Sequence, residues 1–113
     1  MARKKDIVPK KTFATKEDFR KFVEKEKEWM YERIIQCIKY AYKYHLIEAK
    51  VLEASIEDSM TIIEMNSYAE DWEESLTLAI TWYELSENYE KCSEILKLLH
   101  SIQDSQNKGL STI

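Results

Sequence analysis

The sequence predicts an all-α fold, a compact bundle of three or four helices, on three observations. The 113 residues include one Gly and one Pro, too few for the many turns of a β-rich or nucleotide-binding fold. Hydrophobic residues make up 44% and charged residues 34% of the chain, as amphipathic helices require. Apolar residues recur at steps of three and four, which is the spacing of one helix face.

A chain of 113 residues supports one hydrophobic core but not two domains of ordinary size. We expect a flexible basic arm over residues 1–14, a single helical domain over residues 15–103, and a polar, frayed tail over residues 104–113. The arm holds five cations against one carboxylate, so it carries +4 and the remaining residues carry −8. Its cations are Arg3, Lys4, Lys5, Lys10 and Lys11.

The first helix is expected to start after Thr15. The Thr15 hydroxyl can cap the first turn, and Glu17 and Asp18 place negative charge at the positive end of the helix dipole. Apolar residues then follow at helical steps, so we predict one helix over residues 16–44.

A second helix is predicted from about residue 46 to residue 63. Its start is ambiguous, because both Tyr44-His45 and the segment from Ser55 to Asp58 could mark the break. Ser67 and Glu70 have the spacing of a capping box, which predicts that a third helix begins at Tyr68. The apolar residues that define the second helix are Leu46, Ala49, Leu52, Ile56, Met60 and Ile63.

The third helix is expected to extend to Leu85, and a fourth from Tyr89 to about Ile102. A turn at residues 86–88 would separate them. Because neither Gly nor Pro enforces that turn, a single helix over residues 68–103 is an equal alternative.

The cysteines and histidines do not predict a metal site. Cys37 precedes His45, and Cys92 precedes His100, by eight residues, or about 12 Å along a helix, so neither pair can chelate one ion. No stretch reaches the roughly 18 apolar residues of a membrane span, and no signal peptide is evident. We expect free thiols and a cytoplasmic protein.

Acidic residues are concentrated in the C-terminal half. Between Ser67 and Glu90 there are seven carboxylates and no Lys or Arg, a field that would attract a basic partner surface. The predicted acidic face consists of Glu70, Asp71, Glu73, Glu74, Glu84 and Glu87.

Two carboxylate pairs in this segment support an enzymatic alternative. Glu70-x-x-Glu73 and Glu84-x-x-Glu87 resemble the Mg²⁺-binding pairs of all-helical nucleoside triphosphate pyrophosphohydrolases. The interval between the pairs is shorter than in that family, and no Asp closes the second pair. A solvated acidic helix face is the simpler interpretation.

Aromatic residues exceed what one core stripe requires. The chain has three Trp and seven Tyr, residue types that bury large areas at interfaces with little loss of rotamer entropy. We expect a homodimer that uses aromatic residues of the first helix. The predicted partner-binding residues are Trp29, Tyr40, Tyr44, Trp72, Trp82 and Tyr83.

The run from Ala79 to Cys92 resembles the turn between the two helices of a tetratricopeptide repeat. Tyr83, Tyr89 and Cys92 fit the pattern of that family, and the resemblance covers residues 76–104. Ile80 and Leu99 stand where small residues are usual, and no second copy is legible. The resemblance implies a single helical hairpin and a peptide- or protein-binding scaffold.

These observations predict a non-enzymatic helical protein-interaction module, an adaptor or regulator, without cofactor, metal or membrane contact. The alternative is a small nucleic-acid-associated factor whose basic arm contacts phosphates. Binding to duplex DNA across a salt series separates the two hypotheses.

Overall fold

The computed structural model describes residues 7–111 of the chain. Within it the chain divides into two compact units, Met1–Ala69 and Glu70–Ile113. The N-terminal unit combines helices with a sheet, and the C-terminal unit is helical.

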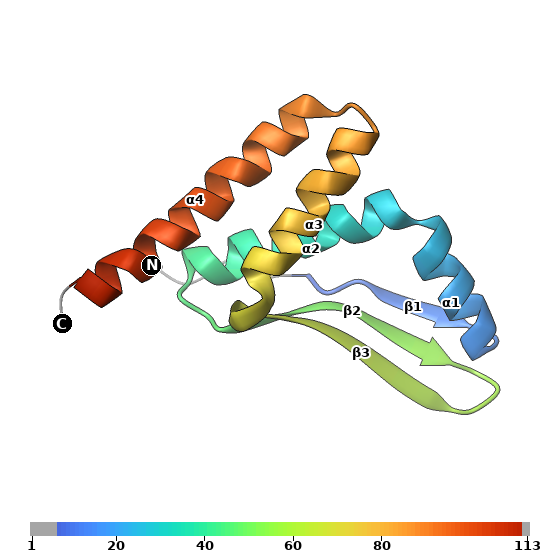
Figure 1. Cartoon of the computed structure of the whole chain (residues 1–113). Coiled ribbons are helices and arrows are strands. Elements are labelled where there is room, and N and C mark those ends of the chain that lie inside the picture. Colours follow the sequence, from blue (N-terminus) through green and yellow to red (C-terminus); the bar gives the residue numbers. More distant parts are fainter. Residues whose placement is uncertain (1–6, 112–113) are drawn as a thin grey trace. The chain divides into compact units, whose positions relative to one another are not determined.

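The N-terminal unit contains a three-stranded mixed sheet. Its elements are β1 (Lys10–Phe13), α1 (Lys16–Lys25), α2 (Lys27–Lys43), β2 (Glu48–Ile56) and β3 (Thr61–Tyr68). The strands lie in the order β1-β2-β3, with β1 parallel and β3 antiparallel to β2. A parallel pair needs a crossover connection, which α1 and α2 provide, and both helices lie on the same side of the sheet (Figure 1).

The all-α prediction, and with it the helical bundle, is therefore wrong. The segment 46–63, predicted as the second helix, forms all of β2 and the start of β3. Its apolar residues satisfy two periods at once: Leu52, Ala54 and Ile56 also alternate at steps of two, and all three are buried. Pairing of β2 with both neighbouring strands selects the period of two, because local propensity is weak compared with tertiary contacts.

Both ends of the predicted bundle also differ from the structure. Lys10 and Lys11, assigned to the flexible arm, lie in β1. Arg3, Lys4 and Lys5 lie outside the described residues. At the other end the last helix extends to Ser111, beyond residue 103, where the sequence predicted a frayed tail.

The start of the first helix is confirmed. The Thr15 hydroxyl accepts a hydrogen bond from the Asp18 amide at 3.1 Å, and α1 begins at Lys16. The predicted helix over 16–44 is divided at Glu26, whose backbone (φ −99°, ψ 50°) leaves the helical region between α1 and α2.

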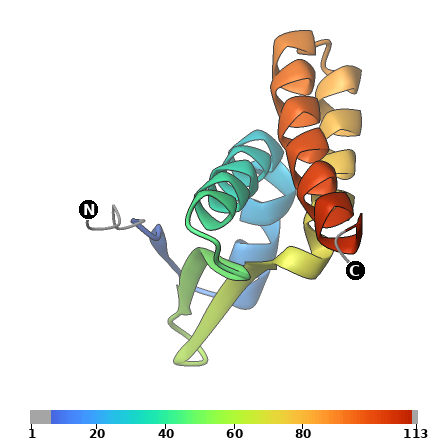
Figure 2. The same ribbon diagram turned by 90° about the vertical axis from the view of Figure 1, so that its left-hand side faces the viewer.

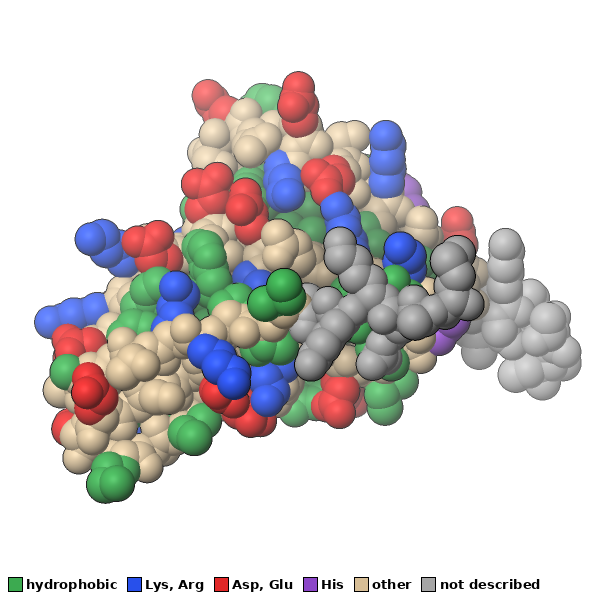
Figure 3. Space-filling view, turned by 180° about the vertical axis from the view of Figure 1, so that it is seen from behind, with side chains coloured by type: hydrophobic (Ala, Val, Ile, Leu, Met, Phe, Trp, Pro, Cys, Tyr) green, Lys and Arg blue, Asp and Glu red, His purple; other side chains and the backbone are tan. Residues whose placement is uncertain are grey.

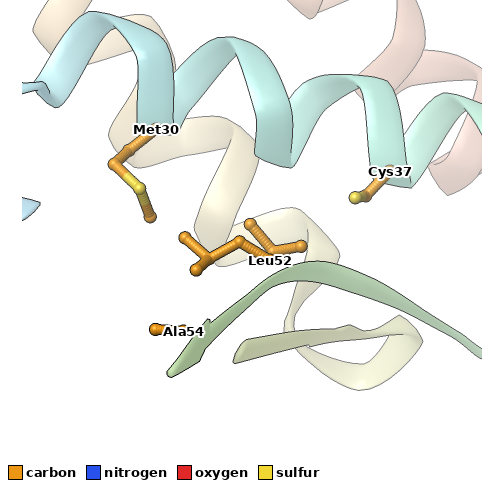
Figure 4. Packing of buried hydrophobic residues seen from close by; sticks show 5 residues of the cluster. Met30, Cys37, Leu52 and Ala54 are labelled. Carbon is orange, nitrogen blue, oxygen red and sulfur yellow. The ribbon is translucent and has the colours of Figure 1, made fainter. Parts of the chain in front are cut away.

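The core of the N-terminal unit lies between α2 and the sheet. Met30 and Cys37 from α2 point toward Leu52 and Ala54 of β2 (Figure 4). Partly buried aromatic rings extend this core at the side of α1, with centroids 5.3 to 5.6 Å apart in successive pairs. These rings are Phe13, Phe19, Phe22 and Trp29.

A buried arginine satisfies the backbone where the sheet is irregular. The register of β2 and β3 shifts between Lys50 and Leu52. Arg33 of α2 donates from Nε to the Val51 carbonyl at 2.7 Å and from a terminal nitrogen to the Lys50 carbonyl at 2.9 Å. Buried carbonyls need donors, so Arg33 supplies what the interrupted ladder does not.

The C-terminal unit is a helical hairpin. It consists of α3 (Trp72–Leu85) and α4 (Tyr89–Ser111), preceded by a short 3-10 turn, η1 (Ala69–Asp71). The two helices lie side by side in both views (Figures 1 and 2). The alternative of one helix over 68–103 is therefore wrong.

The predicted capping box at Ser67 is also wrong. Ser67 is a buried residue of β3, and α3 starts only at Trp72. Its N-cap, Asp71, makes no side-chain capping hydrogen bond.

Helices α2 and α3 both end at a non-glycine residue with a left-handed backbone conformation. In α2 the Leu46 amide donates to the Ala41 carbonyl at 2.8 Å, and the His45 amide donates to the Tyr42 carbonyl at 3.3 Å. This is the Schellman arrangement, and His45 has the left-handed φ of 57° that it requires.

The turn from α3 to α4 repeats this arrangement. The Asn88 amide donates to the Tyr83 carbonyl at 2.9 Å and the Glu87 amide to the Glu84 carbonyl at 3.0 Å, with Glu87 at φ 60°. Asn88 then caps α4, because its side-chain oxygen accepts from the Lys91 amide at 3.2 Å. Three residues thus end one helix and start the next.

In the part of the chain that the structure describes, no helix has the length and apolar character needed to cross a membrane.

Candidate functional site

Helix α3 carries two separate apolar stripes. The first consists of Trp72, Leu76, Ala79 and Tyr83, at steps of four, three and four, and all four residues are buried. This is the ordinary buried face of an amphipathic helix.

The second stripe of α3 is exposed. Leu78, Trp82 and Leu85 follow one another at steps of four and three, which places them in a row on one side of the helix. At about 100° per residue this row lies roughly 120° around the helix from the buried stripe. The exposed fraction is 53% for Leu78 and 81% for Leu85, and Trp82 is half-buried between them.

The stripe ends at the tip of the hairpin, where α4 adds another aromatic residue. Tyr89, the first residue of α4, is 65% exposed. We call Leu78, Trp82, Leu85 and Tyr89 the tip stripe.

Carboxylates lie at the same tip of the hairpin as Leu85 and Tyr89. Glu84, Glu87 and Glu90 are exposed on the same two helix ends and the turn between them. Figure 3 shows acidic side chains (red) on either side of a hydrophobic patch at the top of the view, where the hairpin turns. The next cation along the chain, Lys91, has its Nζ 3.6 Å from a carboxylate oxygen of Glu94.

The tip holds a residue in an unfavourable backbone conformation. Glu87 occupies the left-handed position of the turn, where a residue with a Cβ costs energy that Gly does not. Such outliers motivate hypotheses of function, and here the outlier places a carboxylate at the exposed tip.

The six aromatic residues singled out in the sequence are not brought together. Trp72 and Tyr83 are buried, and Trp82, which stacks edge-on against Tyr83 at 5.0 Å, is the one that lines the tip stripe. Trp29 packs against Phe22 at 5.6 Å. The remaining two, Tyr40 and Tyr44, contact each other on α2 with centroids 5.0 Å apart.

The predicted acidic face is spread along α3. Glu70 and Asp71 lie in η1, Glu73 and Glu74 in the first turn of α3, Glu84 in its last turn, and Glu87 in the turn that follows. Glu73 and Glu84 are eleven residues apart, or about 16 Å along the axis. The two carboxylate pairs therefore cannot share one Mg²⁺ ion.

No group of three or more metal-ligating side chains occurs among residues with described placement.

The two described cations of the predicted arm make contacts inside the N-terminal unit. Lys10 Nζ lies 4.0 Å from a carboxylate oxygen of Glu53. Lys11 Nζ lies 5.2 Å from the ring centroid of Phe22 and 5.0 Å from that of Trp29, within cation–π range.

Sequence reasoning missed Leu78 and Leu85 as candidate binding residues. Their signal is the second row of helical steps through Trp82, a residue that the sequence already assigned to partner binding. A separate count of apolar steps on that side of α3 finds both leucines.

Comparison of this chain with protein-family models, curated proteins and solved structures finds no match.

Proposed function

We propose that this chain is a non-enzymatic protein-interaction module, an adaptor or regulator whose α3–α4 hairpin binds a protein partner through the tip stripe. The observation that carries the proposal is that α3 has two apolar stripes and only one of them is buried. Burying a Leu side chain is worth about 1.5–3 kcal/mol, so Leu78 and Leu85 offer a partner a substantial gain.

The charge of the hairpin indicates the chemistry of the partner. Residues 70–113 contain nine Asp and Glu against three Lys, a net charge of −6. Opposite charges around an apolar contact increase association rate and specificity. We therefore assign the tip stripe a partner with basic residues around an apolar centre.

The spacing of the stripe fits an amphipathic helix. Side chains at steps of four and three form a ridge that packs against the same spacing on another helix. Trp82 and Tyr89 supply the amphipathic aromatic contacts that dominate many interfaces. The resemblance of residues 76–104 to a tetratricopeptide hairpin implies the same class of function.

Fluorescence anisotropy with two labelled synthetic peptides tests the proposal. Both are 18-residue helical peptides with Leu at steps of three and four; one has Lys and Arg beside the Leu row, and the other has Glu at those positions. We expect the intact chain to bind the basic peptide, more weakly as salt rises, and not the acidic one.

Variants then locate the binding surface. Leu78→Ser combined with Leu85→Ser should weaken binding of the basic peptide at least tenfold, since each tenfold corresponds to about 1.4 kcal/mol. The matched control is Ile47→Ser, which removes a 77% exposed side chain of the N-terminal unit and should leave binding unchanged. Equal affinity of the double variant and the parent would refute the tip stripe as the site.

Nucleic-acid binding through the basic arm is the alternative proposal. It depends on Arg3, Lys4 and Lys5 together with Lys10 and Lys11, and duplex DNA titrated from low to high salt tests it. Binding at low salt with a steep salt slope would favour it, and the absence of binding would remove it.

We also propose a cytoplasmic location. Cys37 and Cys92 are both free thiols, as expected in a reducing compartment.

A further inference from the structure

The two edges of the sheet differ in how they are protected. The β1 edge is four residues long and carries Lys10 and Lys11, and short, lysine-bearing edges resist pairing with another strand. The β3 edge is eight residues long, and its only charged residue is Glu64. No strand in the described part of the chain pairs with the outer side of β3.

The exposed side chains of β3 include large apolar ones. Ile62 is 63% exposed and Tyr68 is 42% exposed, with exposed Glu64 and Asn66 between them. Figure 3 shows hydrophobic side chains at the hairpin end of the sheet, at the lower left of the view. Unpaired strands of this kind are templates for pairing.

The four residues of β3 with exposed side chains also direct their backbone N–H and C=O groups toward the free edge. The Ala69 amide donates to the Ile47 carbonyl at 2.8 Å, so Ala69 faces β2. In an antiparallel ladder the direction alternates from one residue to the next. The N–H and C=O groups of Ile62, Glu64, Asn66 and Tyr68 therefore face outward.

We infer that β3 pairs antiparallel with β3 of a second copy of this chain, with the two-fold axis at Met65, to form a continuous six-stranded sheet. In this register Ile62 lies opposite Tyr68 of the second copy, and Glu64 lies opposite its Asn66. Exposed apolar side chains therefore lie opposite each other, and the Glu64 carboxylate lies opposite the Asn66 side-chain amide, which can donate a hydrogen bond to it. Aromatic and β-branched cross-strand pairs are favourable.

Neighbouring registers with the same hydrogen-bonding pattern are less favourable. An axis at Glu64 places the two Glu64 carboxylates directly opposite each other, which is destabilising. An axis at Asn66 places Ile62 opposite Glu70, and Glu64 opposite Tyr68. Only the axis at Met65 joins the apolar residues without opposing two carboxylates.

The charge on Glu64 is already balanced within its own sheet. Lys50 Nζ donates to Glu64 Oε1 at 3.0 Å, and it also lies 3.8 Å from Glu53 Oε1. This ion pair lowers the cost of placing Glu64 beside a second strand, whereas two Glu64 carboxylates directly opposite each other still repel.

This dimer is independent of the proposed partner site, because it uses no residue of the tip stripe. It is a different interface from the helical one expected from the sequence, of which Trp29 packs, partly buried, against the core of its own unit.

The oligomeric state of the intact chain is the first test. Multi-angle light scattering at about 100 μM should give the mass of a dimer. Asn66→Pro should give a monomer, because Pro removes the outward N–H and is tolerated only where a strand edge is free. Asn66→Thr keeps that N–H and should remain dimeric.

Ile62→Ser gives a second variant in case the proline disturbs folding. The Ile62 side chain is exposed, so its loss should not change the circular dichroism spectrum, but it should weaken dimerisation about tenfold. A monomeric parent, or a dimer that Asn66→Pro and Ile62→Ser leave equally stable, would overturn the inference.

Disulfide cross-linking tests the register. Non-hydrogen-bonded antiparallel partners have Cα atoms about 4.5 Å apart, within disulfide range. In a Cys92→Ser background, Met65→Cys should form a disulfide-linked dimer under mild oxidation. Ile63→Cys should not, because its symmetry mate lies four residues away, or about 13 Å. The reverse outcome would overturn this register.

Discussion

Arg33 provides a quantitative test of how the N-terminal unit holds its sheet. The residue is 5% exposed and donates to two carbonyls, those of Lys50 and Val51, at the register shift of β2. Arg33→Met keeps an unbranched apolar stem but removes both donors. A buried carbonyl left without a donor costs roughly 1–3 kcal/mol. The Val51 carbonyl loses its Arg33 donor, whereas the Lys50 carbonyl keeps a weak donor in the Cys37 thiol at 3.4 Å, so we predict a loss of about 2–4 kcal/mol in the free energy of unfolding.

A loss of that size is a large part of the roughly 5–15 kcal/mol that stabilises an ordinary protein. Urea unfolding followed by far-ultraviolet circular dichroism measures this loss. The slope of the unfolding free energy against urea concentration should be the same for variant and parent. Arg33→Lys, which keeps the charge but lacks the planar fork, should lose about half as much. A change below about 1 kcal/mol for Arg33→Met would mean that these two hydrogen bonds do not stabilise the sheet.

Three smaller predictions concern local interactions. Thr15→Ala removes the cap of α1 and should cost about 1 kcal/mol in urea unfolding; an unchanged midpoint would mean that the helix end is frayed. His45→Gly and Glu87→Gly relieve left-handed strain and should each raise stability by up to about 1 kcal/mol, and a lower melting temperature would contradict this. The hydrogen bond from Arg20 lowers the pKa of Glu17, so this pair should stabilise the fold above the ordinary Glu pKa of about 4.3 and lose that contribution as pH falls further. A carboxyl NMR titration should show the Glu17 midpoint rising in Arg20→Gln, and an unchanged midpoint would refute the pairing.

The turns could not be predicted from the usual residue signals. Turns at His45, Met60 and Glu87 all have left-handed φ values, between 51° and 60°, yet none of these residues is Gly. A sequence with one Gly therefore appeared to have few turns. The expectation of Gly at such positions is statistical, and tertiary contacts can hold another residue there.

Strands β2 and β3 could not be predicted from the sequence for a different reason. Between Leu52 and Ile56 the apolar pattern is compatible with both helix and strand. The strand conformation is decided by pairing with β1, which is distant in sequence, and with β3, which follows a turn at Met60 that no Gly marks. By contrast, the start of α1 was predictable, because Thr15 and the acids after it act locally.

The candidate site was predictable in part. The acidic segment and the off-phase position of Trp82 are properties of the sequence itself. Burial of Trp72 and Tyr83 is not, because an aromatic residue suits a core as well as an interface. Helix packing decides between the two, and one sequence does not contain that information.

The most direct test of the proposed function is an amide chemical-shift map of the intact chain titrated with the basic amphipathic peptide. We predict that the largest shifts lie in residues 78–90, around Leu78, Trp82, Leu85 and Tyr89, and that residues of β2 and β3 remain unchanged. Shifts centred on the N-terminal unit, or no shifts at millimolar peptide, would contradict the assignment of the hairpin as the partner-binding surface.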